Sequence, residues 1–174
     1  LYLGGYELHK NVRTLLNAYT YVGPAVGSDY PLLLAGKKPE PGPNYPDYDA
    51  HIKESELGEY VRWIGFVDEE DKPALYRQAM TVVFPSNHEG FGLPPPEAMA
   101  CGTPVVTTNA SSLPEVVGDA AFTVPPDDSR EMAGAIIASL IQDNLRAEMR
   151  VKGLEQASQF SWEKTAAETL TVYD

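Results

Sequence analysis

Two carboxylates flank a glycine-containing loop in the stretch formed by residues 84–104. This stretch reads Phe-Pro-Ser-Asn-His-Glu-Gly-Phe-Gly-Leu-Pro-Pro-Pro-Glu-Ala-Met-Ala-Cys-Gly-Thr-Pro, and Glu89 and Glu97 lie eight positions apart in it. Gly90 and Gly92 allow backbone amides to approach a ligand closely, because no side chain intervenes. We interpret the stretch as a strand end, a ligand-binding loop and a short helix. The alternative is a tight turn that needs glycine only for its geometry.

Three consecutive prolines, Pro94, Pro95 and Pro96, occupy the expected first turn of that helix. Proline is tolerated there because the first N–H groups of a helix have no intrahelical partner, but it also removes them as donors. An anion at this helix start should therefore be bound by the amides of residues 90–93.

Three charged side chains near the loop suit a phosphorylated sugar ligand. Glu89, at the strand exit, could accept hydrogen bonds from sugar hydroxyls. Glu97, one turn into the helix, could bind a diol such as a ribose, or could merely interact with the helix dipole. Lys10 follows the first strand and could neutralise a phosphate. Its alternative is an ordinary solvated lysine.

Metal and dinucleotide sites are not expected. Asp47 and Asp49 have a metal-binding spacing, but they follow a loop with prolines at 39, 41, 43 and 46 instead of a buried strand. His and Cys residues show no ligand-like clustering. The first strand ends in Gly4-Gly5 without the G-x-G-x-x-G pattern of dinucleotide-binding proteins.

Strand-like and helix-like segments alternate along the whole chain. Strands are expected at residues 1–3, 31–36, 61–67, 81–84, 104–107 and 121–124. Helices are expected after a cap at Asn11, over 48–57, after Asp71, from 94, after 128, around 145–154, and over 162–173 with Ser161 as cap. This order predicts one α/β domain with a mostly parallel sheet of about six strands and helices on both faces. Ligands of such sheets bind beyond the carboxyl ends of the strands.

Composition limits the kinds of partner. The chain has 174 residues, 43% hydrophobic and 22% charged, which is ordinary for a globular domain. No run approaches the roughly 20 apolar residues that cross a membrane. The net charge of −12 disfavours nonspecific nucleic-acid binding. Cys101 is the single cysteine, so an internal disulfide is excluded and a reducing, cytoplasmic location is expected. The chain opens on a strand already under way, which suggests a fragment.

The motif Glu89-Gly-Phe-Gly-Leu-Pro-Pro-Pro-Glu97 resembles the E-x7-E signature of the retaining group 1, family-four glycosyltransferases of the GT-B fold. Similar landmarks follow in family order: Leu34-Ala-Gly36, Ile64-Gly-Phe-Val67, residues 79–86, Leu113-Pro-Glu-Val-Val-Gly118 and Phe160-Ser-Trp162. The resemblance implies that residues 1–174 form the single Rossmann-like, nucleotide-sugar-binding half of a GT-B enzyme. The N-terminal acceptor-binding domain would then be missing.

The resemblance also implies residue roles. Glu89 and Lys10 are the catalytic candidates, facing the donor sugar and the diphosphate. Glu97 would bind the ribose, and Phe66 and Val67 would border the base. The other substrate-binding candidates are Gly5, Asn11, Ser86, His88, Gly90, Phe91, Gly92 and Leu93. Many members carry an arginine where Gly5 stands, and Pro96 replaces a more usual aliphatic residue.

The expected function is donor binding for transfer of a hexose to an acceptor hydroxyl, without a metal or other cofactor. The Gly4-Gly5 and His9-Lys10-Asn11 arrangement favours GDP-mannose, with a UDP-hexose as the other donor. The isolated chain should bind donor weakly and transfer nothing. Peripheral membrane contact through the missing domain is left open. The alternatives are a non-catalytic nucleotide-sugar-binding module and a sugar-nucleotide epimerase of the same fold.

Overall fold

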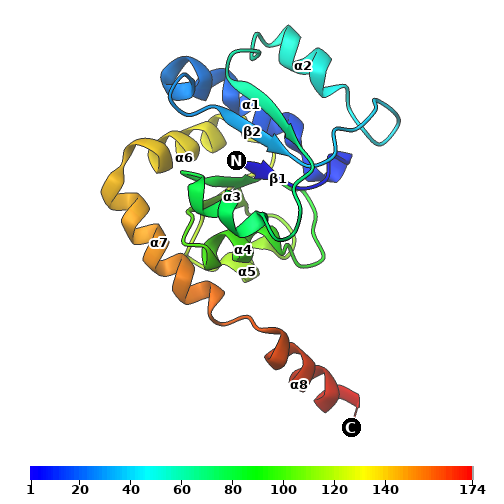
Figure 1. The fold of residues 1–174 in the computed structure, drawn as a ribbon, viewed down its shortest axis with the longest axis vertical. Helices are drawn as coiled ribbons and strands as arrows, with labels where there is room; N and C mark the ends of the chain where they lie inside the picture. Colours follow the sequence, from blue (N-terminus) through cyan, green and yellow to red (C-terminus); the bar gives the residue numbers. More distant parts are fainter. Residues whose placement is uncertain (174) are drawn as a thin grey trace.

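The computed structural model describes residues 1–173, in which short strands alternate with helices (Figure 1). The strands are β1 (Tyr2–Leu3), β2 (Leu32–Ala35), β3 (Val61–Gly65), β4 (Val82–Phe84), β5 (Val105–Thr108) and β6 (Phe122–Val124). The α-helices are α1 (Val12–Val22), α2 (Tyr48–Glu54), α3 (Lys72–Gln78), α4 (Pro94–Ala100), α5 (Leu113–Val117), α6 (Ser129–Ile141), α7 (Asp143–Ala157) and α8 (Trp162–Tyr173). A 3-10 turn η1 (Leu8–Lys10) precedes α1, and a π-helical turn η2 (Gly23–Gly27) follows it.

The strands form two parallel three-stranded sheets, with the orders β1-β2-β3 and β4-β5-β6. Hydrogen bonds of Leu1 join the two. Its amino group donates to the Thr81 carbonyl at 3.0 Å, and its carbonyl accepts from the Val83 amide at 2.9 Å. The spatial order is therefore 3-2-1-4-5-6, and the expected parallel sheet of about six strands is confirmed. This order reverses direction between β1 and β4, which is where ligands bind in such folds.

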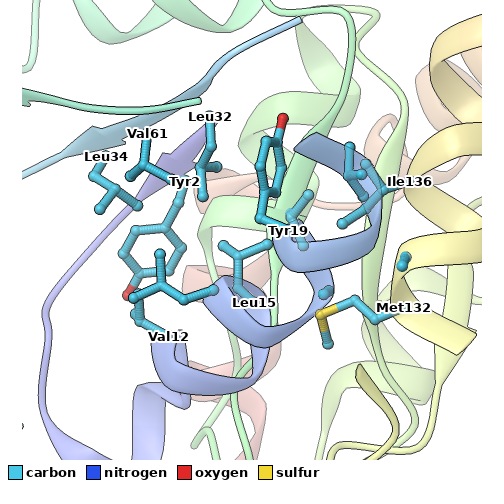
Figure 2. Packing of buried hydrophobic residues seen from close by; sticks show 14 of the residues in the cluster. Tyr2, Val12, Leu15, Tyr19, Leu32, Leu34, Val61, Met132 and Ile136 are labelled. Carbon is cyan, nitrogen blue, oxygen red and sulfur yellow. The ribbon is translucent and has the colours of Figure 1, made fainter. Parts of the chain in front are cut away.

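Hydrophobic side chains cover both faces of the sheet, because successive strand residues point to opposite sides. Tyr2 belongs to a core cluster with Leu15 of α1 and Ile136 of α6, and Figure 2 shows these side chains between the helices and strands. The next residue, Leu3, belongs to a second cluster with Met99 of α4. The prediction of helices on both faces is thus confirmed.

The C-terminal helices differ in how they are packed. Helix α7 packs on α4, where Gly153 lies so close to Met99 that a Cβ would come within 3.3 Å of its Cγ. Helix α8 has no buried residue and projects away from the rest of the domain (Figure 1). Ser161 caps it as expected, since its Oγ accepts from the Lys164 amide at 3.1 Å. In the part of the chain that is described, no helix is both long and apolar enough to span a membrane.

Two sequence-based expectations about element ends were wrong. Strand β3 ends at Gly65, two residues early, because Gly65 has a φ of +79° that leaves the extended region. Helix α2 ends at Glu54 and not at residue 57. Ser55 is its C-terminal cap, and the next residue, Glu56, leaves the helical conformation with a φ of +55°. Phe66 and Val67 therefore follow the strand and lie outside it.

Asn11 precedes α1 as expected, but its side chain does not cap the helix. Its Nδ2 donates to the carbonyls of Pro85 at 3.0 Å and Pro126 at 2.7 Å, and its Oδ1 accepts from the Thr14 hydroxyl at 2.8 Å. The side chain thus links the start of α1 to the segments that follow β4 and β6. Its φ of +55° is one that asparagine tolerates better than most residues.

We predict that Asn11→Ala destabilises the domain by about 2 kcal/mol or more, because three hydrogen bonds are lost and two carbonyls lose their donor. Urea denaturation of the variant would measure this. Asn144→Ala, on an exposed position of α7, is the control and should change little. Asn11→Gly loses the same bonds but relieves the positive φ, so it should be less destabilised than Asn11→Ala. Wild-type stability of the alanine variant would show that the bonds contribute nothing.

Candidate functional site

The two catalytic candidates meet beyond the carboxyl ends of β1 and β4. Lys10 ends the turn η1, whose His9 carbonyl accepts from the Asn87 amide at 2.8 Å. Glu89 lies five residues after Phe84, the last residue of β4. The Lys10 Nζ lies 2.8 Å from the Glu89 Oε1, and the two side chains are only 20% and 11% exposed. The structure thus places in direct contact two residues that are 79 positions apart.

The ammonium group of Lys10 has more hydrogen-bond donors than its ion pair with Glu89 uses. An ammonium group has three donors, and the Lys10 Nζ donates to Glu89 alone among the described residues. The same nitrogen lies 5.7 Å from the centroid of the Phe84 ring. Lys10 can therefore keep its contact with Glu89 and donate to an anion as well.

The glycine loop presents four backbone amides without protein acceptors. Within residues 1–173, no N–H of residues 90–93 donates a hydrogen bond. Helix α4 begins at Pro94, as predicted, so the first turn adds no competing donors. Gly92 has a φ of +93°, and a Cβ there would lie 2.7 Å from Leu113 Cδ2, so glycine is required on two counts. That these amides bind a ligand stays a prediction.

Glu97 lies in the first turn of α4, and one of its oxygens is held by Tyr76 of α3. The Tyr76 hydroxyl donates to the Glu97 Oε2 at 3.0 Å. Burial, and then the neighbouring Glu97 carboxylate, raise the pKa of Tyr76 well above its usual range, so the hydroxyl remains a donor. The other oxygen, Oε1, accepts no hydrogen bond within the described chain and can face a ligand. Tyr76 was not among the site residues predicted from the sequence.

Ser86, His88 and Gly5 lie at the same sheet edge. The Ser86 side chain is fully buried and its Oγ has no hydrogen-bond partner in the described structure. The His88 Nδ1 lies 3.3 Å from the Ser111 Oγ. The Gly5 carbonyl accepts a hydrogen bond from the Tyr2 hydroxyl. Their roles in substrate binding stay predictions.

Phe66 and Val67 lie beyond β3, two strands away from β1. Phe66 is 75% exposed, whereas Val67 packs against the second core cluster. No hydrogen bond or ion pair in the described structure connects either residue to Lys10 or Glu89. A contact with a base therefore also stays a prediction.

The Asp47 and Asp49 pair is used in local structure. Asp47 caps α2 by accepting from the Ala50 amide at 2.9 Å. Asp49 forms an ion pair with Lys38 and accepts from the Trp63 Nε1 at 3.1 Å. Across residues 1–173, no group of three His, Cys, Asp or Glu side chains is arranged to hold a metal ion.

Two serines that sequence reasoning missed contact the glycine loop. Ser111 and Ser112 lie between β5 and α5 and donate to backbone carbonyls of Glu89 and Phe91. Their position directly after an expected strand could have indicated them, because β5 ends at the same sheet edge as β1 and β4.

Two surface hollows lie elsewhere: one includes Tyr30 and Met80, near the amino ends of β2 and β4, and the other includes His51 of α2. Neither Lys10 nor Glu89 lines them.

The class of protein follows from sequence comparison. The family profile described as "Glycosyl transferases group 1" matches residues 1–156. The chain is also 43% identical to the O-antigen chain mannosyltransferase B of Escherichia coli, over 99% of the chain and 45% of that protein. The chain belongs to the group 1 glycosyl transferases, so the resemblance is confirmed.

Solved structures support the same assignment. Sucrose-phosphate synthase from Thermosynechococcus elongatus superimposes with a TM-score of 0.87 at 30% identity, over 99% of this chain and 43% of that one. HepE from Anabaena, solved with UDP, gives 0.83 at 27% identity, over 98% and 48%. The fold matches the Rossmann-like C-terminal domain of GT-B glycosyltransferases. The chain spans less than half the length of these three proteins.

We predict that Tyr76→Phe lowers the free energy of unfolding by about 1.5 kcal/mol, because a hydrogen bond to a charged group is lost. Urea denaturation would measure it, with Tyr21→Phe on an exposed position as control. A double-mutant cycle with Glu97→Ala isolates the pair. If Tyr76→Phe lowered the free energy of unfolding by the same amount with and without the Glu97 carboxylate, the prediction would be wrong.

Proposed function

We propose that this chain is the donor-binding part of a retaining glycosyltransferase that transfers a hexose from a nucleotide diphosphate sugar to an acceptor hydroxyl. The observation that carries the proposal is the contact of Lys10 with Glu89, next to four backbone amides that have no acceptor within residues 1–173. A cation and free amides suit a diphosphate, and a carboxylate suits the hydroxyls of the attached sugar.

The geometry supports a division of roles along the donor. As the bond between the anomeric carbon and the diphosphate oxygen breaks, negative charge grows on the diphosphate. Lys10 and the amides of residues 90–93 stabilise that charge, and they need little rearrangement because the fold already holds them. Glu89, held by Lys10, orients the sugar, and Glu97, held by Tyr76, binds the ribose. No metal is required in this scheme.

The relatives favour a mannosyl donor. The E. coli relative at 43% identity is named a mannosyltransferase of the O-antigen chain. We therefore propose GDP-mannose as donor and a cell-surface polysaccharide as the product class. A UDP-hexose is the second donor candidate, since HepE was solved with UDP. A cytoplasmic location with peripheral membrane contact is consistent with this role.

The acceptor is proposed to bind a further domain. The chain corresponds to 45% of the length of the E. coli relative, and Lys10 and Glu89 lie beyond the carboxyl ends of β1 and β4. A second domain facing that edge would bring the acceptor hydroxyl to the sugar and exclude water. The 174 residues alone should therefore bind donor weakly and transfer nothing.

We predict that GDP-mannose raises the melting temperature of the chain more than UDP-glucose or UDP-N-acetylglucosamine does, because ligands that bind only the folded state stabilise it. The complete polypeptide should then transfer mannose with retention, read by NMR of the product anomer. If no nucleotide sugar binds either the chain or the complete polypeptide, the proposal is wrong. Binding without transfer by the complete polypeptide would favour a non-catalytic module, and an inverted product would refute retention.

We further predict that Glu89→Gln lowers the transfer rate of the complete polypeptide by about 100-fold, as expected for a group that acts on the reacting sugar. Affinity for GDP alone should not fall, because Lys10 is released from its carboxylate partner. Both quantities come from kinetics and calorimetric titration. Glu115→Gln, an exposed acid of α5, is the matched control. If Glu89→Gln weakens GDP as strongly as GDP-mannose, Glu89 does not act on the sugar.

A further inference from the structure

Two adjacent serine hydroxyls bind the backbone of the glycine loop. The Ser111 Oγ lies 2.8 Å from the Glu89 carbonyl oxygen and also accepts from the Glu89 amide at 3.3 Å. The Ser112 Oγ lies 2.9 Å from the Phe91 carbonyl oxygen and 3.1 Å from that of Glu89. Each hydroxyl has one proton. The arrangement that satisfies both carbonyls has Ser111 donating to Glu89 and Ser112 donating to Phe91.

These hydrogen bonds set the direction of two amides. The carbonyl of Glu89 and the N–H of Gly90 belong to one peptide unit, which is planar and trans, so the two groups point in opposite directions. The carbonyl of Phe91 and the N–H of Gly92 are related in the same way. Since both carbonyls point toward the serines, both N–H groups point away from them. These are two of the four amides that have no protein acceptor.

Further features hold the same contact in place. Leu113, the first residue of α5, packs so closely on Gly92 that no Cβ fits between them. Ser111 has a φ of +56°, which is uncommon for a residue other than glycine. Its hydroxyl bonds to both backbone groups of Glu89 help to keep this conformation.

We infer that Ser111 and Ser112 are positioning residues that aim the amides of Gly90 and Gly92 at the diphosphate of the donor. The inference rests on the proposed function and adds a part to it. Lys10 supplies one cationic contact, and the two aimed amides supply fixed dipoles from a different segment. The serines touch no substrate. They act by ordering a loop whose two glycines would otherwise sample many conformations.

The test compares Ser112→Thr with Ser112→Val, which have nearly the same shape and differ in the hydroxyl. Calorimetric titration with GDP and with UDP is the readout. The valine variant should bind about tenfold more weakly than wild type, which corresponds to the loss of about one hydrogen bond. The threonine variant should bind like wild type. Ser158→Ala is the matched control, because the Ser158 hydroxyl also donates to a backbone carbonyl, that of Glu155, at 2.7 Å.

A second readout needs no ligand. Backbone order parameters of the Gly90 and Gly92 amides, measured by NMR relaxation, should be lower in Ser112→Val than in Ser112→Thr, while those of β5 stay the same. Ser111→Gly removes the other hydroxyl without backbone strain and should also weaken GDP binding. Equal affinity and equal order parameters in the threonine and valine variants would overturn the inference alone. If neither the chain nor the complete polypeptide binds GDP or UDP, the proposed function is overturned and the inference with it.

Discussion

The contact between β1 and β4 determines where this domain can do chemistry. Two hydrogen bonds of Leu1 join the two halves of the sheet there. The next strand after β1 lies on one side of this junction, and the next strand after β4 lies on the other. The connections that leave β1 and β4 therefore diverge and leave room between them. Lys10 follows β1 and Glu89 follows β4, so their ion pair depends directly on this strand order.

Lys10 and the loop amides carry positive charge, whereas the chain as a whole is negatively charged. With 25 acidic and 13 basic residues, the surface as a whole repels polyanions. Lys10 is nevertheless partly buried, and the amides of residues 90–93, which donate no hydrogen bond within residues 1–173, add partial positive charge nearby. Partly buried groups are screened less than surface charges. The net charge therefore disfavours nonspecific nucleic-acid binding without opposing the predicted binding of one small anion at this edge. Glu89 limits the same attraction, because its carboxylate shares the Lys10 ammonium with any ligand.

Local patterns sufficed to predict the parallel sheet and the edge where Lys10 and Glu89 meet, because strand composition and βαβ alternation are properties of neighbouring residues. Contacts of single polar side chains could not be predicted in this way. Asn11 was expected to cap α1, but carbonyls 74 and 115 positions away bind its amide group instead. The Tyr76 hydroxyl reaches Glu97 across 21 positions, and Ser112 reaches Phe91 across 21. Such partners are set by the packed fold, and no spacing rule identifies them.

The three prolines of α4 and the two serines after β5 both affect which backbone amides can bind an anion before α4. Pro94, Pro95 and Pro96 remove three helix amides as donors, so the backbone donors near this helix start are those of the glycine loop before them. That loop is the segment least able to order itself, because glycine loses more conformational freedom than any other residue. If the loop became ordered only when a ligand bound, the loss of its conformational entropy would weaken the binding. Hydroxyls from the turn after β5 bind the loop carbonyls in the free protein, so much of the ordering cost is met during folding. A loop that is flexible by composition can thereby present fixed donors.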